Sequence, residues 1–415
     1  MGGVGTDRLA DRVFFQEWEG RALGERRSLP RARALAEILD VLSLNIPVLT
    51  VVGSKGKGTA ATYASAFLTA AGLKVCTVTS PGLRDDRDRI RLGGRSVSEK
   101  ELASLAARLH AGIDVLPPSD GYLSPAGLFT LAGLLHARDT GADALVLEAG
   151  MGGRADEVSL FPPDVVALTP VFLEHADVLG GTAAEIAREK TAVAGPGTRA
   201  VLSAPQLPEV TDALRGGVEI VAAGGSGLAS RLLPRGLGRV SAELGVVAAR
   251  RLPGVQEPPA GRAEAVLGSV VLPGRLSWHP VPASATTVLI DSAIDRAGVA
   301  AALTAARERW GTIDHAVVCL PDHKDLDGAV AELGDLPVTF VRLPMPHLRF
   351  TRALPPAWDV VDAAAVTPES LATLGYRVLV LGTVYFTGLV LGVVDAPTRC
   401  LFSAAAPPRP AGSRA

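Results

Sequence analysis

The segment VLTVVGSKGKGT, residues 48–59, decides the fold of this 415-residue chain, because an apolar run leads directly into a glycine-rich stretch. Glycines let backbone N–H groups curl around phosphates, and the start of a following helix adds positive potential. Here Lys57 can neutralise the β- and γ-phosphates of a nucleotide, and the Thr59 hydroxyl can ligate Mg²⁺. The alternative is a plain glycine-rich turn, which explains the lysine and threonine less well. The predicted nucleotide-binding residues are Gly53, Ser54, Lys55, Gly56, Lys57, Gly58 and Thr59.

Apolar runs and longer amphipathic stretches alternate along the rest of the chain. Strands are predicted at 48–52, 74–78, 144–147, 165–169, 200–202, 287–290, 315–320, 338–342 and 377–381, and helices at 60–71, 99–110, 127–138, 183–191, 241–251 and 296–309. Continuous apolar runs indicate strands covered on both faces, as in a parallel sheet flanked by helices. The predicted fold class is α/β, with a P-loop-type, doubly wound parallel sheet domain followed by a smaller Rossmann-like α/β domain.

Proline and glycine cluster at 253–261 and 273–282, and the second cluster precedes a new strand. We therefore predict an ATP-binding domain over residues 1–280 and a C-terminal α/β domain over 281–395. The tail, residues 396–415, is rich in Ala, Pro and Arg towards its end and is predicted to be disordered.

The composition excludes several classes of protein. With 41 basic and 43 acidic residues the net charge is −2, so no overall field favours nucleic acid or an anionic membrane. Three scattered cysteines argue for a reducing compartment and against a Cys-ligated zinc. The N-terminus lacks a secretory signal, and the uncharged segment 378–394 is too short and too rich in glycine to span a bilayer. We expect a cytoplasmic, soluble protein without nucleic-acid or membrane partners.

The loop has Val51 where the generic nucleotide loop has glycine, and its spacing resembles instead the Mur ligase and folylpolyglutamate synthase group. Further segments resemble this family, in family order, from about residue 45 to 388. They are TSPGL (79–83) with DRIRLGG (88–94), LEAGMGGR (147–154) with Asp156, LEHADVLG (173–180) with EIAREK (185–190), PGR (273–275) and GTVY (382–385). Each match is weak alone, and together they identify a divergent member of the family.

The resemblance implies a reaction and a set of site residues. The family joins a carboxylate to an amine: the acid attacks the γ-phosphate of ATP to give an acyl phosphate, which the amine then opens. The implied catalytic residues are Lys57, His175 and Lys190, with Lys190 as a carbamate formed from CO₂. The implied ligands of two Mg²⁺ ions are Thr59, Ser80, Glu148, His175 and Lys190, and Arg275 and Asp291 would hold nucleotide from the domain boundary.

These residues also have readings of their own. Glu148 ends a predicted buried strand, where a carboxylate is costly unless a cation pairs with it, but it could equally cap the turn that follows. His175 alone is more often a hydrogen-bonding residue than a ligand, and Ser80 an ordinary turn residue before proline. Lys190 would ordinarily be an exposed helical lysine. A carbamate needs a neutral amine, which burial or nearby cations can provide.

The second half departs most from the family pattern. Asp291-Ser292-Ala293-Ile294-Asp295-Arg296 stands where the family reads Asp-Gly-Ala-His-Asn-Pro, and Leu237-Gly238…Ser241 stands where it has His-Gln…Asn. In the first half, Ser54-Lys55 replaces Thr-Asn, Gly82 replaces His and Gly127 replaces Glu. The segment 201–241 is also shorter than its family counterpart.

We interpret the chain as an ATP-dependent carboxylate–amine ligase, acting as a monomer on small molecules. Folate with glutamate is one substrate pair, and a different acid and amine in specialised metabolism is the other. A catalytically impaired nucleotide-binding partner protein is an alternative favoured by the altered segment at 291–296. An NTP-dependent kinase or motor is disfavoured by Val51 and by the set Glu148, His175 and Lys190.

Overall fold

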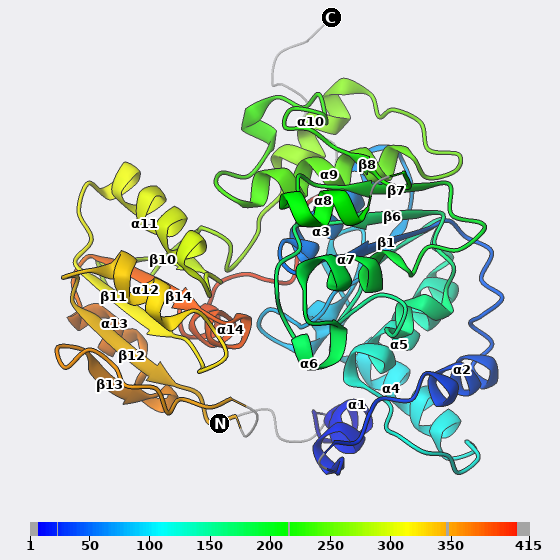
Figure 1. Cartoon of the computed structure of the whole chain (residues 1–415), viewed down its shortest axis with the longest axis horizontal. Coiled ribbons are helices and arrows are strands. Elements are labelled where there is room, and N and C mark those ends of the chain that lie inside the picture. Colours follow the sequence, from blue (N-terminus) through cyan, green and yellow to red (C-terminus); the bar gives the residue numbers. More distant parts are fainter. Residues whose placement is uncertain (1–6, 23, 215, 346–347, 405–415) are drawn as a thin grey trace, which may run out of the picture.

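The computed structural model describes residues 7–404 except 23, 215 and 346–347, and it contains two α/β domains side by side (Figure 1). The first is built on a sheet with strand order β4-β3-β2-β5-β1-β6-β7-β8. Its strands are β1 (Val48–Val52), β2 (Val75–Val78), β3 (Ile90–Leu92), β4 (Arg95–Ser96), β5 (Ala144–Glu148), β6 (Val165–Leu168), β7 (Ala200–Ser203) and β8 (Glu219–Ile220). All neighbours are parallel except β3, which runs antiparallel to β2 and β4.

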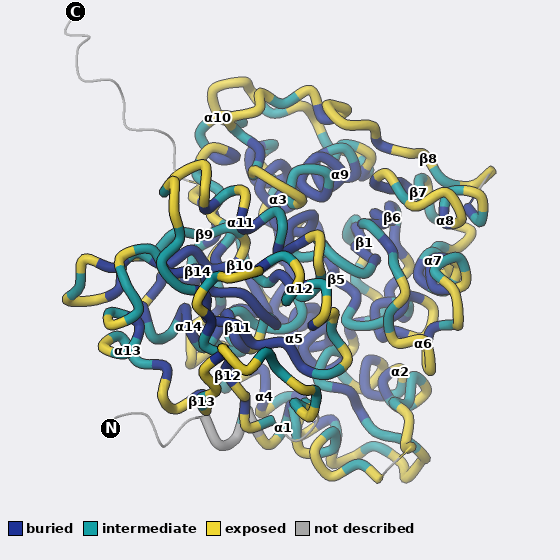
Figure 2. Tube along the Cα trace, turned by 60° about the vertical axis from the view of Figure 1, so that its left-hand side comes forward, coloured by how far each residue is buried: buried dark blue, intermediate teal, exposed yellow. Residues whose placement is uncertain are grey.

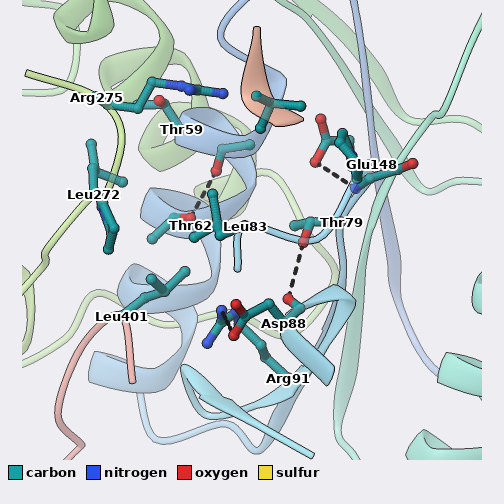
Figure 3. Close-up of a pocket in the computed structure, with 15 residues that line it drawn as sticks. Thr59, Thr62, Thr79, Leu83, Asp88, Arg91, Glu148, Leu272, Arg275 and Leu401 are labelled. Atoms are coloured by element: carbon teal, nitrogen blue, oxygen red, sulfur yellow. Dashed lines mark hydrogen bonds and ion pairs between the residues drawn. The ribbon is translucent and has the colours of Figure 1, made fainter. Parts of the chain in front are cut away.

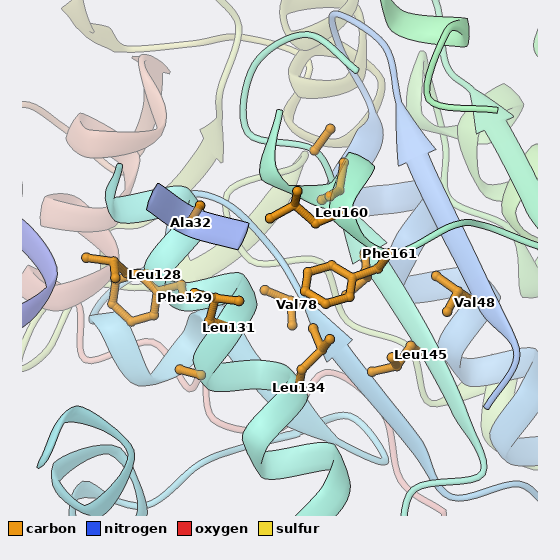
Figure 4. Packing of buried hydrophobic residues seen from close by; sticks show 14 of the residues in the cluster. Ala32, Val48, Val78, Leu128, Phe129, Leu131, Leu134, Leu145, Leu160 and Phe161 are labelled. Carbon is orange, nitrogen blue, oxygen red and sulfur yellow. The ribbon is translucent and has the colours of Figure 1, made fainter. Parts of the chain in front are cut away.

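Helices cover both faces of this sheet. Their bounds are α1 (Asp7–Gly20), α2 (Leu29–Ile38), α3 (Lys57–Ala70), α4 (Glu99–Ile113), α5 (Pro125–Thr140), α6 (Ala176–Leu179), α7 (Ala183–Thr191), α8 (Pro208–Ala213), α9 (Gly238–Arg250) and α10 (Ala260–Gly268). Along β1, Val48 and Val52 pack with α1, α2, α4 and α5, whereas Leu49 and Val51 pack with α3 and α9. Figure 4 shows part of the first of these two cores. Alternate side chains of one strand thus enter two cores, which explains the continuous apolar runs.

The second domain has the strand order β13-β12-β11-β14-β10-β9. Its strands are β9 (Ser277–Pro280), β10 (Thr287–Asp291), β11 (His315–Cys319), β12 (Val338–Arg342), β13 (Asp359–Asp362) and β14 (Arg377–Gly382), and its helices are α11 (Arg296–Trp310), α12 (Leu326–Leu333), α13 (Pro368–Thr373) and α14 (Val384–Val393). Helices α11 and α12 pack on one face and α14 on the other. In both domains the buried positions concentrate in the strands, and the exposed ones lie in loops and on outer helix faces (Figure 2).

The predicted fold class is confirmed, as is every strand predicted from an apolar run. The uncharged segment 378–394 forms β14, a tight turn and α14. Within the part of the chain that the structure describes, no helix combines the length and the apolar character needed to cross a membrane. The unpredicted strands are the short or edge ones, β3, β4, β8, β9 and β13, which bury too few side chains to leave an apolar run.

The position of β9 bears on the domain boundary. This strand precedes residue 281, yet it pairs antiparallel with β10 inside the second sheet. A boundary between residues 280 and 281 would separate two paired strands. We therefore propose that the domains divide within residues 269–276, between the end of α10 and the start of β9.

The predicted disordered tail is wrong for residues 396–404, and the remainder, 405–415, lies outside the described residues. After α14 the chain returns to the first domain, where residues 399–403 form a segment that we call the C-terminal strap. Ser96 N donates to Arg399 O (2.9 Å), Leu401 N to Gly94 O (3.0 Å) and Val271 N to Leu401 O (2.8 Å). Leu401 and Phe402 are buried in the core with α3. Two adjacent apolar residues, Leu401 and Phe402, are too few to show a helix or strand periodicity, so the sequence did not predict this segment.

Gly94 makes room for the strap. It has φ +83°, and a Cβ there would lie 2.9 Å from ring atoms of Phe402. Only glycine fits both the left-handed backbone and the contact with the ring. Since α14 belongs to the second domain, the chain crosses between the domains twice, at 269–276 and again before the strap.

We expect Phe402→Ala to lower the free energy of unfolding by about 3 kcal/mol, because it empties a buried aromatic site. Phe402 is 3% exposed, and Tyr376→Ala, at 68% exposure, is the matched control and should change little. Urea denaturation followed by circular dichroism measures both. Equal, small effects of the two variants would mean that the strap contributes little to stability.

Candidate active site

The glycine-rich loop joins β1 to α3 exactly where the parallel strands end. Gly53 and Gly56 have φ +137° and +84°, and a Cβ would lie 2.0 Å from Thr169 Oγ1 at Gly53 and 2.1 Å from Ser241 Oγ at Gly56. Both positions therefore require glycine. Among the described residues no side chain caps the start of α3, so the N–H groups of its first turn face the loop uncapped. A helix that begins this way attracts anions.

Two lysines converge on one backbone oxygen in this loop. Lys57 Nζ donates to Gly53 O (3.1 Å), and Lys190 Nζ donates to the same oxygen (3.0 Å) from helix α7. Lys190 also pairs with Glu174 Oε1 at 3.0 Å. It is only 1% exposed, so it is not the solvated helical lysine that its position would ordinarily suggest. Burial, reinforced by the charge of Lys57, lowers the pKa of Lys190.

Glu148 lies across from these lysines at the end of β5. Ser80 N donates to its Oε2 (3.1 Å), and no ion pair to its carboxylate exists within the described residues. Burial raises the pKa of Glu148, although the charges of Lys57 and Arg275 act in the opposite direction. A buried carboxylate without a direct cation partner is costly, so this position suits a divalent cation.

A pocket between the domains gathers part of the predicted set (Figure 3). It is lined by Gly58, Thr59, Thr62, Thr79, Ser80, Pro81, Leu83, Asp88, Arg91, Glu148, Leu272, Pro273, Arg275, Val384 and Leu401. Thr59, Ser80, Glu148 and Arg275 thus share one cavity although they come from four separate segments. Gly53, Lys57 and Lys190 do not line it; they form the lysine cluster beside it, and the charge of Lys57 acts on Glu148.

Arg275 lies in the segment that joins the domains, and Asp291 ends β10 of the second domain. Arg275 reaches the pocket and hydrogen-bonds to Ser292 Oγ. Asp291 Oδ2 accepts a hydrogen bond from Leu276 N (2.7 Å), so its carboxylate fixes the chain just before β9. Burial raises the pKa of Asp291 in spite of nearby Arg275.

The structure does not bring His175 to the pocket with the other predicted metal ligands. It is exposed, precedes α6 with a left-handed backbone (φ +46°) and does not line the pocket. The charges acting on its ring come from Glu174, Lys324, Lys190 and Asp177. Over residues 7–404, gaps excepted, no three His, Cys, Asp or Glu side chains group so as to hold a metal ion. The predicted metal ligands contain only two such residues, Glu148 and His175.

An ion pair between the domains was missed by sequence reasoning. Lys55 Nζ of the loop pairs with Asp295 Oδ2, and Asp295 also caps α11 by accepting from Gly298 N (2.8 Å). Both residues depart from the family pattern. Their opposite charges were the one feature of the sequence that could have predicted the ion pair. Lys324 lies within electrostatic range of Lys55, Asp295 and Glu174, and burial lowers its pKa.

A buried charge cluster joins Arg27 to Asp156 and Glu157, and sequence reasoning, which named only Asp156, missed it. Arg27 Nη1 contacts Asp156 Oδ2 (3.1 Å) and Glu157 Oε2 (3.2 Å), and Ser124 Oγ donates to Glu157 Oε1 (2.7 Å). A Cβ at Gly127 would lie 2.6 Å from the Glu157 side chain. The carboxylate of Glu157 therefore occupies the space that a glutamate at position 127 would need.

The relatives found by comparison with known proteins are folylpolyglutamate and dihydrofolate synthases. No protein-family model matches the chain. A dihydrofolate synthase/folylpolyglutamate synthase of Escherichia coli is 32% identical over 183 residues, which is 43% of this chain and 42% of that protein. Its counterpart from Mycobacterium tuberculosis is 28% identical over 359 residues, 74% of this chain and 72% of that protein. A probable bifunctional folylpolyglutamate synthase/dihydropteroate synthase of Halobacterium salinarum is 36% identical over 154 residues, 37% of this chain.

Coverage of these relatives is partial. The chain spans 19% of the Halobacterium protein and less than half of the E. coli protein. Among solved structures, Mycobacterium tuberculosis folylpolyglutamate synthase complexed with ADP and AMPPCP has a TM-score of 0.77 at 21% identity, covering 95% of this chain and all of that one. At this identity the likeness establishes the fold.

The carboxylate of Glu157 should make stability depend on pH. Burial, together with Asp156, raises its pKa to about 7. Between about pH 4.5 and 7 the unfolded chain therefore releases a proton that the folded chain keeps, so stability falls as pH rises through that window. We expect Glu157→Gln to remove this part of the pH dependence.

Urea midpoints at pH 5 and pH 7.5 measure the effect. Glu157→Gln should gain stability relative to the natural chain at the higher pH, whereas the exposed control Glu308→Gln should follow the natural chain at both. If the difference in urea midpoint between the natural chain and Glu157→Gln is the same at both pH values, the assignment of a raised pKa to Glu157 is contradicted.

Proposed function

We propose that this chain is a divergent member of the folylpolyglutamate synthase/Mur ligase family and that it uses ATP to join a carboxylate to an amine. One observation carries the proposal. Lys57 and Lys190 meet on the carbonyl of Gly53, beside a pocket whose buried Glu148 has no direct cation partner among the described residues. Surplus positive charge next to an unpaired carboxylate suits a phosphate group with its divalent cation. We also propose a monomeric, cytoplasmic protein.

The residues divide the work of such a reaction. The loop Gly53–Thr59 and the first turn of α3 would hold the phosphates, with Lys57 as the nearest cation. Thr59, Ser80 and Glu148 would hold Mg²⁺, and Arg275 and Asp291 would hold nucleotide from the domain boundary. When bound, Mg²⁺ neutralises charge on the phosphates. The chain's own contribution is orientation and fixed positive charge at the point where phosphoryl transfer occurs.

We propose further that Lys190 acts as a carbamate. Support comes from its burial, its lowered pKa and the adjacent Lys57, since all three favour the neutral amine that captures CO₂. As an ammonium, Lys190 pairs with Glu174. The negative charge of a carbamate at Lys190 would repel the carboxylate of Glu174. Glu174 would then need another cation as its partner, and Lys324 lies within electrostatic range of Glu174. His175, next to Glu174, would complete the second metal site only after a rearrangement of this segment.

Two substrate pairs have support. Folate with glutamate is favoured by the names of the relatives and by the E. coli FolC structure in complex with DHPP and ADP, which has a TM-score of 0.72 at 22% identity over 94% of this chain. A different acid and amine is favoured by the Lys55–Asp295 pair and by Glu157, which fills space beside Gly127. Both pairs need the same phosphate chemistry.

A phosphate-release assay over acids and amines tests the proposal. Dihydropteroate, tetrahydrofolate and L-glutamate come first, followed by other acids and amines, with product identified by mass spectrometry. ATP-dependent phosphate release that requires both an acid and an amine, with an amide product, is the expected result. Tight ATP binding without turnover on any pair would instead favour an impaired nucleotide-binding protein.

We expect Lys190→Ala to reduce ligation by a factor of about 100 or more, because it removes a group that contacts the phosphate loop. Added acetate or propionate should restore part of the activity by replacing the carbamate. Lys100→Ala, an exposed lysine on α4, is the control and should retain full activity. Full activity in Lys190→Ala would remove the carbamate from the mechanism.

A further inference from the structure

The segment 291–296 of the second domain departs from the family pattern and connects two parts of the site. Near its start, Arg275 Nη1 donates to the hydroxyl of Ser292, and Arg275 lines the pocket. Near its end, Asp295 pairs with Lys55 of the glycine-rich loop. One short segment therefore holds a pocket residue at one end and the loop of the first domain at the other.

The position of Asp295 is fixed on both sides by Asp325, the residue before α12. Asp325 N donates to Ile294 O (3.2 Å), and Arg296 N donates to Asp325 Oδ2 (3.0 Å). The carboxylate of Asp295 caps α11 through Oδ1, which accepts from Gly298 N (2.8 Å), while Oδ2 makes the ion pair. Because the carboxylate is already held in place, the ion pair costs little conformational entropy on the side of the second domain.

The backbone N–H of Lys55 is already used within the first domain. Lys55 N donates to Pro170 O (3.3 Å), and Ser54 N donates to the same oxygen (3.0 Å), so these two N–H groups do not cradle a phosphate. The side chain of Lys55 passes Phe172, with Nζ 5.8 Å from the ring centre, and ends at the second domain. Both the backbone and the side chain of Lys55 thus serve protein contacts.

The place of the ion pair matters more than its strength. Its side chains are 30% and 33% exposed, and ion pairs near the surface add little to overall stability. The chain crosses between the domains at 269–276 and again before the strap, and the two crossings are tied together, since Ser403 N donates to Ser269 Oγ (2.9 Å). Domains joined at one place can rotate about it unless a contact elsewhere fixes them. Lys55 and Asp295 make such a contact from other segments.

We propose that Asp295 is a positioning residue for the reaction: it acts through Lys55 and holds the second domain, with Arg275, against the glycine-rich loop. Lys55 serves this contact and is not itself a phosphate ligand. ATP binds between the loop and Arg275, so both members of the ion pair favour its binding. This inference rests on the proposed function and adds to it the contact that orients the two domains.

Isothermal titration calorimetry of the full chain with AMPPCP and Mg²⁺ tests this role. Asp295→Asn keeps a cap for α11 and should weaken binding about fivefold, because Lys55 loses its partner. A direct effect of charge on the phosphates has the opposite sign, since removal of a carboxylate strengthens the binding of an anion. Lys55→Asp should weaken binding about tenfold, and the charge swap Lys55→Asp/Asp295→Lys should restore it to within about threefold. Asp327→Asn, which breaks an ion pair with Arg352 inside the second domain, is the matched control and should not change binding.

Small-angle X-ray scattering without nucleotide measures the domain positions. Asp295→Asn and Lys55→Asp should each give a larger radius of gyration than the natural chain, and the swap should return it to the natural value. Circular dichroism verifies folding, and Asp295→Asn alone still separates the two signs if the swap does not fold.

Three results would overturn the inference: AMPPCP binding by Asp295→Asn that is as tight as in the natural chain or tighter, a folded swap that binds no better than Lys55→Asp, or a radius of gyration that neither single variant changes. The second result would make Lys55 a phosphate ligand. The proposed function fails separately, if the natural chain binds no nucleotide, and the scattering comparison then still decides whether the ion pair holds the domains together.

Discussion

The carbonyl oxygen of Gly53 accepts hydrogen bonds from two lysine side chains, the buried Lys190 and the half-buried Lys57, and the rest of the site depends on this concentration of positive charge. Two ammonium groups that share one acceptor repel each other, and among the described residues a carboxylate partner, Glu174, pairs with Lys190 but none pairs with Lys57. Such an arrangement is costly in a protein interior unless an anion neutralises it. Burial disfavours the charged form of each group, so it lowers the pKa of Lys190 and raises the pKa of Glu148.

The positions of these charges depend on the sheet. Gly53 follows β1, Glu148 ends β5, and Thr169 follows β6, and these are neighbouring parallel strands in the order β5-β1-β6. Their carboxyl ends meet at one edge, which is where open α/β sheets bind ligands. Gly53 must be glycine because Thr169 of the adjacent strand lies where its side chain would be. The shape of the loop is thus set partly by a residue more than a hundred positions away.

The second domain is tied to this edge at three places. Lys55 pairs with Asp295, Arg84 contacts Asp395 and the carbonyl of Ala396, and the C-terminal strap continues past β4. The pocket has walls from both domains. Three positions named above as departures from the family pattern have partners in space, since Lys55 pairs with Asp295, and the side chain of Glu157 occupies the space beside Gly127.

The sequence by itself determined the fold class, because a strand covered on both faces must be apolar throughout and a helix between strands must be amphipathic. It also located the glycine-rich loop after β1 and the carboxylate of Glu148 at the end of β5, since each lies within one short segment. Only the tertiary structure decided that Lys190 is buried against Gly53, that His175 remains outside the pocket, that Lys55 pairs with Asp295 and that Leu401 lines the pocket. Each of these is a contact between segments far apart in sequence, and periodicity and spacing carry no information about which distant side chains meet.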